Sequence, residues 1–224
     1  DLTVQNWQAP ATAQSGQTIS VNWTAVNAGT FMANGSWNDG VYLSNDAVLD
    51  GNDRLLTTQL ASGPIAIGGT YSRSPQITLP VLPPGAYHLI VVLDNQNFLF
   101  EGQRETNNTA SSSLTVNAPN VDLTVPTVDA PSTATAGQAM NVAWTVRNTG
   151  SEATFASGWT DYVIISRDQV ADASDPTIGY LPHVGSLAGG ATYQAQLAVN
   201  VPQGYSGPHW IFIRTDWWNV VAES

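Results

Sequence analysis

The sequence repeats itself once, and this duplication limits what the chain can fold into more than any other feature. The segment DLTV at residues 1–4 recurs at residues 122–125, and Trp23 recurs as Trp144, both at an offset of 121. A one-residue insertion near residue 30 raises the offset to 122, which holds for the rest of the repeat. Two copies of one unit predict two domains of one fold. We place them at residues 1–117 and 122–224, with a linker at residues 118–121.

Each copy alternates apolar and polar residues with a period of two, which is typical of a half-buried β-strand. Residues 19–27, ISVNWTAVN, place Ile19, Val21 and Trp23 on one face, and the second copy has the same alternation. No segment shows a convincing helical period. Further strands are expected in the first copy at residues 2–8, 38–44, 54–60, 70–79, 86–93 and 110–116.

The number and length of these strands predict an all-β fold of two tandem immunoglobulin-like (fibronectin type III-like) β-sandwich domains. The chain has no cysteine, so burial of apolar side chains has to hold each sandwich together. The second copy has no counterpart of residues 110–116, and we expect its sandwich to lack the last strand. We expect this strand either to follow Ser224 in the parent protein or to come from a neighbouring chain.

The first copy carries the segments SWNDGVYLSNDAVLDGNDRLL and ETNNTASSSLTV, and the second carries NVAWTVRNTG and GWTDYVIISRDQVADASD. These blocks resemble the CARDB family, the cell-adhesion-related domain of bacteria. The resemblance implies an immunoglobulin-like sandwich found as tandem repeats in large secreted or cell-surface bacterial proteins, often adhesins. It implies a non-catalytic structural or adhesion repeat whose partners are adjacent repeats of the parent chain, or a protein or glycan of a cell surface.

The charge of the chain excludes two classes of partner. Asp and Glu number 17 against 6 basic residues, all of them Arg, which gives a net charge of -11. Nucleic acids and anionic lipid surfaces attract clustered positive charge, and none is present. No apolar run reaches the roughly 18 to 20 residues that cross a bilayer, so we expect no direct membrane insertion.

Three aspartates occur close together in SNDAVLDGND, residues 44–53, and again in SRDQVADASD, residues 166–175. Both segments are expected at a hairpin tip, open to solvent. Calcium binds six to eight oxygens and would relieve the repulsion between the carboxylates, although the spacing is not that of an EF-hand. The alternative is turn chemistry without an ion, because Asp and Asn side chains bind nearby backbone N–H groups. The calcium interpretation assigns as metal ligands Asp46, Asp50, Asp53, Asp168, Asp172 and Asp175.

A second acidic set is expected at the other end of each domain. In the first copy, the strands at residues 38–44 and 86–93 are expected to pair antiparallel, so the loop after residue 93 lies near residue 38. The alternative is that the segments DNQN and DWWN are hairpin turns in which Asp leads the turn. The two sets are Asp39, Asp94 and Glu101 in the first copy and Asp161, Asp216 and Glu223 in the second.

The 8 tryptophans suggest either core packing or a carbohydrate-binding surface. Alternation places Trp23 and Trp144 in the core and their partners Trp37 and Trp159 at its rim. Within HWIFIRTD, Ile211 and Ile213 are expected to point inward, so the alternate residues Trp210 and Phe212 are expected to point outward. Packing against other parts of the protein is the alternative to sugar binding for the outward aromatic residues, since exposed apolar patches mostly mark protein contacts. The candidate ligand-contact aromatic residues are Trp210, Trp217 and Trp218.

Catalysis is not expected. The chain has neither Lys nor Cys, and it lacks the G-x-S-x-G and H-E-x-x-H motifs. The three histidines, His88, His183 and His209, do not coincide when the copies are superposed, so no general base is duplicated. The sequence therefore predicts a structural or adhesion repeat with calcium as a candidate stiffening ion, and a carbohydrate-binding module is the alternative.

Overall fold

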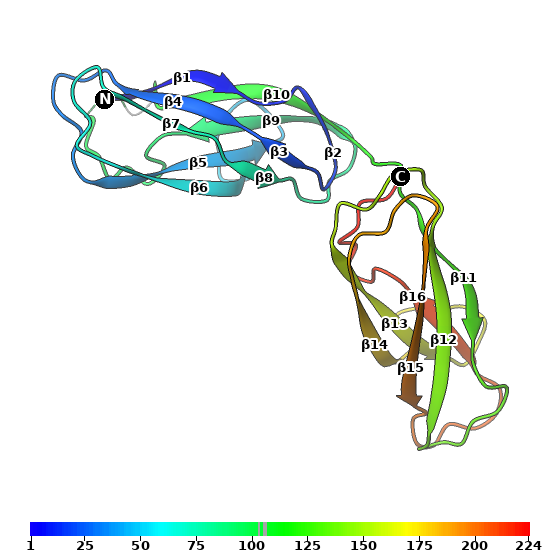
Figure 1. Ribbon diagram of the computed structural model, residues 1–224. Coiled ribbons are helices and arrows are strands. Elements are labelled where there is room, and N and C mark those ends of the chain that lie inside the picture. The colour runs from blue at the N-terminus through cyan, green and yellow to red at the C-terminus, as the bar shows by residue number, and fades with distance from the viewer. Residues whose placement is uncertain (103, 105–106) are drawn as a thin grey trace. The chain divides into compact units, whose positions relative to one another are not determined.

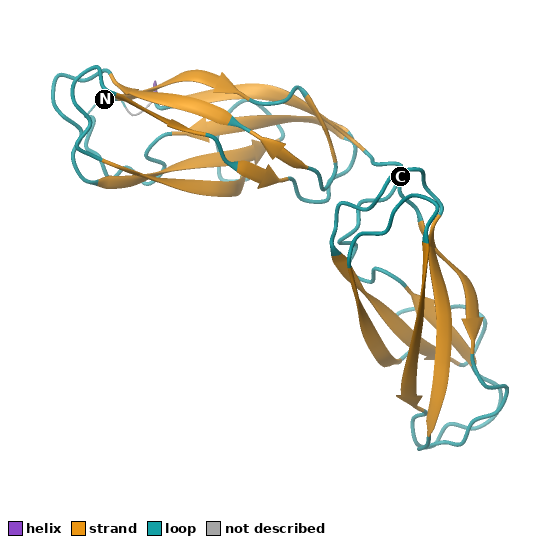
Figure 2. Cartoon of the chain, in the orientation of Figure 1, coloured by secondary structure: helices purple, strands orange, loops and turns teal. Residues whose placement is uncertain are grey.

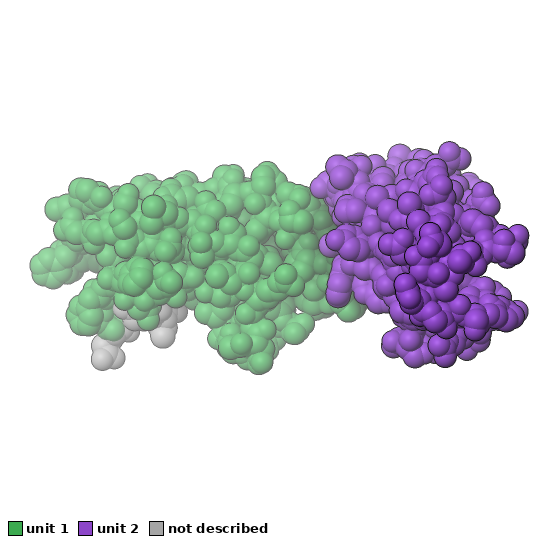
Figure 3. Space-filling model, turned by 90° about the horizontal axis from the view of Figure 1, so that it is seen from below, with its two compact units in different colours: residues 1–117 green, residues 118–224 purple. Residues whose placement is uncertain are grey.

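The computed structural model describes residues 1–102, 104 and 107–224, and these form strands and loops without an α-helix (Figures 1 and 2). The chain divides into two compact units, which Figure 3 colours separately. Unit 1 is Asp1–Asn117 and unit 2 is Ala118–Ser224. The all-β prediction is confirmed. Residues 118–121, expected as a linker, belong to unit 2, and Val121 is fully buried in the core of that unit.

Unit 1 is a sandwich of two sheets. One sheet has the order β1 (Leu2–Gln8), β4 (Asn22–Asn27), β7 (Thr70–Arg73). A separate two-stranded sheet pairs β3 (Thr18–Ser20), which precedes β4 in the chain, with β8 (Gln76–Thr78), which follows β7. The other sheet has the order β2 (Thr12–Gln14), β10 (Thr109–Asn117), β9 (Gly85–Val92), β5 (Ser36–Ser44), β6 (Arg54–Ser62).

Two details of unit 1 differ from the expected strands. The strand expected at residues 70–79 is split into β7 and β8 at Ser74 and Pro75, because proline has no N–H to donate to a ladder. Strand β2 was not expected. It is three residues long and pairs in parallel with β10 through Thr115 opposite Thr12, and so short a segment shows no readable alternation.

The core of unit 1 lies between its two sheets and follows the period-two alternation. Trp23 is 1% exposed and Trp37 is fully buried, deeper than the rim position expected for it. The final strand β10 contributes Leu114 and Val116 to the same core. The apolar residues of alternating segments therefore meet between the sheets, and the loops at the sandwich ends remain on the surface.

Unit 2 repeats this plan with fewer strands. One sheet has the order β11 (Leu123–Asp129), β12 (Ala139–Asn148), β15 (Thr192–Asn200), and the other has the order β14 (Thr177–Val184), β13 (Gly158–Ser166), β16 (Trp210–Arg214). Every residue of unit 2 is described, and none of its strands corresponds to β2 or β10. The prediction that the second sandwich lacks its last strand is confirmed.

Candidate functional site

A buried aspartate lies at the centre of a hydrogen-bond network in unit 1. Asp39 on β5 is 0% exposed. Trp23 Nε1 donates to Asp39 Oδ2 at 2.9 Å, and the Tyr71 hydroxyl donates to Asp39 Oδ1 at 2.9 Å. Trp37 Nε1 donates in turn to the Tyr71 hydroxyl at 2.9 Å. Burial raises the pKa of Asp39 above its ordinary value, and the hydrogen bonds from Trp23 and Tyr71 oppose that rise.

Unit 2 contains the same network. Trp144 Nε1 donates to Asp161 Oδ2 at 2.7 Å, and the Tyr193 hydroxyl donates to Asp161 Oδ1 at 2.9 Å. Trp159 Nε1 donates to the Tyr193 hydroxyl at 3.1 Å. Burial raises the pKa of Tyr193, and the charge and hydrogen bond of Asp161 add to the rise, whereas the hydrogen bonds with Thr215 and Trp159 oppose it. Each central carboxylate is enclosed by donors of its own fold, so it fixes the packing of two sheets and is closed to a substrate.

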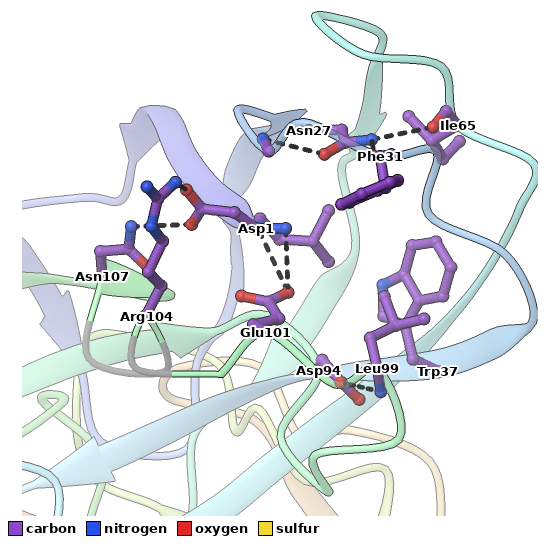
Figure 4. A network of polar contacts seen from close by, with 12 residues as sticks. Asp1, Asn27, Phe31, Trp37, Ile65, Asp94, Leu99, Glu101, Arg104 and Asn107 are labelled. Atoms are coloured by element: carbon purple, nitrogen blue, oxygen red, sulfur yellow. Dashed lines mark hydrogen bonds and ion pairs between the residues drawn. The ribbon is translucent and has the colours of Figure 1, made fainter.

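The other members of the second acidic set do not gather into one site (Figure 4). The backbone N–H of Asp94 donates to Asp39 Oδ1 at 3.3 Å, but the Asp94 carboxylate accepts from the N–H groups of Phe98 and Leu99 at 3.0 and 2.6 Å. Glu101 accepts from the Leu2 N–H at 3.1 Å. The turn interpretation of DNQN therefore describes this end of unit 1. Asp94 lies beside Asp39 as expected, but the three described carboxylates do not form one metal-binding group.

The equivalent turn of unit 2 has the same construction. Asp216 accepts from the N–H groups of Val220 and Val221 at 2.9 and 2.8 Å, and Glu223 accepts from the Leu123 N–H. Asp216 has a φ of 46°, and so does its counterpart Asp94. Aspartate tolerates this left-handed conformation because its carboxylate binds the nearby backbone.

The hairpin-tip aspartates of unit 1 bind their own loop. Asp46 Oδ1 accepts from the Val48 N–H at 2.8 Å, and Asp50 Oδ1 accepts from the Asn52 N–H at 2.7 Å. Asp53 Oδ2 accepts from the Asp50 N–H at 2.8 Å. These contacts span two or three residues, which is the local geometry that makes Asp frequent in turns.

The hairpin tip of unit 2 repeats these contacts. Asp168 Oδ1 accepts from the Val170 N–H at 2.8 Å, and Asp172 Oδ1 accepts from the Ser174 N–H at 2.7 Å. Asp175 Oδ2 accepts from the Asp172 N–H at 2.9 Å. The hydrogen bonds from Ser174 lower the pKa of Asp172. Across the described part of the chain, no three His, Asp or Glu side chains are placed to hold one metal ion. Turn chemistry accounts for both loops as they stand.

The three candidate ligand-contact tryptophans occupy two different places in unit 2. Trp210 begins β16, is half-buried and lies opposite Ser166, whereas Trp217 and Trp218 follow the other end of that strand. Trp218 is 69% exposed, and its Nε1 donates to the Tyr162 hydroxyl at 3.1 Å. The Trp217 ring lies 5.2 Å from that of Tyr162. Trp217 and Trp218 therefore form one aromatic cluster with Tyr162, and Trp210 is separate from it.

A cluster that the sequence analysis missed lies at one end of unit 1. Four apolar side chains there are exposed, and we call them the apolar tip: Phe31 at 83%, Met32 at 52%, Phe98 at 63% and Phe100 at 96%. They line a cavity of about 570 Å³ together with Asp1 and Glu101. The repeat could have revealed this cluster, because the aligned residues of unit 2 are Glu152, Ala153, Val220 and Ala222.

The family comparison assigns the chain. The CARDB family model matches residues 1–112 and again residues 120–224, once for each unit. The chain belongs to the CARDB family. It consists of two tandem CARDB repeats, and the resemblance expected from the sequence is confirmed. A search of curated proteins finds no match. No helix among the described residues is long and apolar enough to cross a membrane.

Solved structures similar to this CARDB chain come from varied proteins. A CARDB domain from Pyrococcus furiosus, crystallised in complex with di-metal ions, is 19% identical with a TM-score of 0.38, over 52% of this chain and 92% of that one. A beta-glucosidase from Listeria innocua, in complex with isofagomine, is 14% identical with a TM-score of 0.37, over 52% of this chain and 16% of that one. A red sea bream transglutaminase is 10% identical with a TM-score of 0.31, over 95% of this chain and 29% of that one.

Proposed function

We propose that this chain is a non-catalytic structural and adhesion repeat of a large secreted or cell-surface bacterial protein. The observation that carries the proposal is that the aspartates at equivalent positions of the two repeats form hydrogen bonds within the fold. Asp39 and Asp161 accept from buried Trp and Tyr donors, and Asp94 and Asp216 accept from backbone N–H groups. Carboxylates committed to the fold in this way support a rigid module, because their oxygens are already used as acceptors within the fold.

Adjacent repeats are the proposed partners of the apolar tip. In unit 2, the loop equivalent to the one that carries Phe31 binds the segment entering the unit. Glu152 Oε2 accepts from the Asn120 N–H at 2.7 Å, and the Glu152 N–H donates to the Asn120 carbonyl at 3.0 Å. The Ser224 N–H donates to the Val121 carbonyl at 3.0 Å. The end of unit 1 that carries the apolar tip therefore corresponds to the end of unit 2 at which that unit's own first residues, 120 and 121, are bound.

A tandem of two full-length copies tests this proposal. We expect the loops of Phe31 and Phe98 in the second copy to exchange their amide hydrogens more slowly than in the single chain. Phe100→Ser should remove the extra protection, because apolar contact drives the association. Leu60→Ser, which changes an apolar side chain of 66% exposure on β6, is the matched control. Equal exchange in the tandem and the single chain would contradict contact between repeats.

Calcium stiffening of the hairpin loops is part of the proposal and rests on the carboxylates themselves. Each loop carries three aspartates on a hairpin between two paired strands, outside the core of its sandwich. An ion bound only by the folded state should raise the melting temperature by several degrees, and chelator should reverse the shift. Asp50→Asn combined with Asp172→Asn should abolish it. A melting temperature that calcium and chelator leave unchanged would remove calcium from the proposal.

Carbohydrate binding by unit 2 is the second candidate function, favoured by the exposure of Trp218 beside Tyr162 and Trp217. Arg214 stacks on the Trp217 ring at 4.6 Å and would add hydrogen-bond donors beside the aromatic faces. A glycan array separates the two functions. Sugar binding lost in Trp218→Ala but retained in Val184→Ala, where an 86% exposed side chain on β14 is shortened, would favour this candidate. An array without a single bound glycan would exclude it.

A further inference from the structure

A row of aromatic side chains crosses one sheet of unit 2. Tyr162 on β13 lies directly opposite Tyr180 on β14, and their ring centroids are 5.9 Å apart. The Trp217 ring, in the turn after β16, lies 5.2 Å from that of Tyr162. We call Tyr180, Tyr162 and Trp217 the aromatic row. It adds Tyr180 to the aromatic cluster described above and runs from the edge strand β14 across β13 to the turn after β16.

The aromatic row faces away from the core of unit 2. Successive side chains of a strand point to opposite faces, and Val163, next to Tyr162, is fully buried. On β14, Leu181 packs against the core, and the adjacent Tyr180 is 63% exposed. At the other end of the row, Trp217 is followed by the exposed Trp218. The aromatic row therefore lies on an open sheet face, and both of its ends are accessible.

Unit 1 has no aromatic residue at the positions that align with the row, which are Thr58, Gly40 and Asn95. Asn95 Nδ2 donates to the Tyr42 hydroxyl at 3.0 Å. A Cβ atom on Gly40 would lie 2.7 Å from Asn95 Nδ2. The Asn95 side chain therefore fills, in unit 1, the place where Tyr162 projects in unit 2. The aromatic row is a feature of unit 2 and is not part of the interior that both units share.

The charge of the row and of the chain favours an uncharged ligand. Arg214 on β16 lies opposite Tyr162, and its guanidinium carbon is 4.6 Å from the centroid of the Trp217 ring. This cation opposes binding of a polycation. The net charge of -11 repels a polyanion, and one guanidinium is not the clustered positive charge that a polyanion needs. A neutral ligand with hydroxyl groups can accept from the Arg214 N–H groups.

The geometry of the row favours a chain of sugar units. An aromatic side chain stacks its apolar face on the C–H face of a sugar ring, while polar groups at the edge of the row meet the sugar hydroxyls. The two centroid distances, 5.9 and 5.2 Å, are close to the length of one sugar unit in an extended chain. Neighbouring rings are tilted by 34° and 40°, so the row is not one flat plane. It fits a single chain whose units turn along its length better than the flat face of a crystalline polysaccharide.

We propose that the aromatic row binds an uncharged, linear polysaccharide along the length of its chain. Consecutive sugar units stack on Tyr180, Tyr162 and Trp217, and Arg214 donates to a sugar hydroxyl at the Trp217 end. Because both ends of the row are open, the polysaccharide continues past it, and the row binds internal units rather than a chain terminus. This inference rests on the carbohydrate-binding candidate proposed above and adds to it the class of glycan, the contribution of Tyr180 and the mode of binding.

Titration of the full chain with soluble neutral oligosaccharides of increasing length tests the proposal. The series are built from glucose, mannose, xylose or galactose units. We expect the affinity for at least one series to rise with each added unit up to about three units, one for each ring of the row, and then to level off. Uronic acid oligosaccharides of the same lengths should bind about tenfold or more weakly, because each of their units carries a negative charge.

Variants that copy unit 1 locate the bound chain. Tyr180→Thr copies Thr58 and should lower the affinity for the longest oligosaccharide about fivefold, because one stacked ring is lost. Phe155→Thr, which removes a 44% exposed ring of unit 2 outside the row, is the matched control and should leave the affinity unchanged. Arg214→Gln should weaken binding by a similar factor. Arg167→Gln, which removes a guanidinium that stacks on another ring of unit 2, should not.

The outcomes separate this inference from the carbohydrate-binding candidate. Glycan binding that depends on Trp218 and is unchanged by Tyr180→Thr would overturn the inference and leave the candidate in place. So would a monosaccharide that binds as tightly as its longer oligosaccharides, equal binding of the uronic acid series, or binding confined to crystalline cellulose. Absence of binding to every glycan would remove the candidate and this inference together.

Discussion

Units 1 and 2 have nearly the same interior and different surfaces. Both bury an aspartate under a Trp and a Tyr, both cap a turn with an aspartate at a φ of 46°, and both tie a hairpin tip with short Asp contacts. The surfaces differ at the apolar tip of unit 1 and at the aromatic cluster of unit 2. The comparison shows which contacts these two CARDB repeats share and at which positions they differ.

Substitution of the buried aspartates should lower the free energy of unfolding more than the other changes, and by similar amounts in the two units. Asp39→Ala and Asp161→Ala each leave an indole N–H and a phenol hydroxyl without their acceptor. We expect each change to lower the free energy of unfolding of its own unit by about 2–5 kcal/mol, since each buried group left unpaired costs about 1–3 kcal/mol. Chemical unfolding of the full chain, followed by hydrogen exchange in each unit, measures the effect.

Asparagine at the same positions is the matched control. Asp39→Asn and Asp161→Asn keep one oxygen as an acceptor, so their effects should be smaller than those of the alanine variants. A loss confined to one unit when both are changed would contradict the idea that the two networks have the same role. It would mean that other contacts hold the sheets together in the tolerant unit.

The turn-capping aspartates should give the next largest effect. Asp94→Ala and Asp216→Ala each remove the acceptor of two backbone N–H groups and place alanine in the left-handed region. We expect a loss of about 1–3 kcal/mol in each unit from the unpaired N–H groups and the strained backbone. Glycine at either position should cost less, because it adopts a positive φ without strain. Equal losses for alanine and glycine would contradict a contribution from backbone conformation.

The alternation of residues was enough to predict the sandwich, its core tryptophans and most of its strands. It did not predict which side chains meet across the sheets. Asp39 and Tyr71 lie 32 residues apart, and their hydrogen bond depends on how two sheets pack, which a single strand does not encode. The sequence also did not show where the carboxylates of the second acidic set bind. Asp94 accepts from N–H groups of its own turn, whereas Glu101 accepts from the N–H of Leu2, 99 residues away in the chain.

The missed apolar tip has a different cause. Phe31 and Phe98 lie in loops, where alternation gives no information about exposure. Comparison of the copies would have marked them, since Glu152 and Val220 occupy the aligned positions. A difference between copies therefore indicates a specialised surface in this chain more directly than the properties of either loop alone.

The hairpin-tip aspartates should give a small effect that is alike in both units. Asp46→Ala and Asp168→Ala each remove one acceptor of a backbone N–H at an exposed turn. We expect a loss of about 0.5–1.5 kcal/mol in each unit, because water replaces part of the lost hydrogen bond. Thermal unfolding of the full chain measures it. Serine at either position should recover part of the loss, since its hydroxyl accepts the same N–H.

His183 should give the smallest effect, and one found in unit 2 alone. It stacks on Tyr193 at 4.0 Å and lies 4.2 Å from the Trp159 ring, where unit 1 has the buried Ala61. Its buried Nε2 has no hydrogen-bond partner among the residues described. Burial lowers the pKa of His183 from its ordinary 6.5, although the charge of Asp161 and the backbone of Gly185 oppose the shift.

The lowered pKa fixes the sign of the pH dependence. Between the pKa of folded His183 and 6.5, the unfolded chain binds more protons than the folded chain, so the stability of unit 2 should fall as the pH drops below about 6.5. Unfolding of the full chain from about pH 8 to pH 5 measures the slope. His183→Ala, which copies Ala61, should flatten the slope of unit 2 and leave unit 1 unchanged. The unsubstituted chain and the His183→Ala variant both retain His88 and His209. A slope that survives the substitution would therefore assign the pH response to other groups, and the difference between His183 and Ala61 would have no effect on the pH dependence of stability.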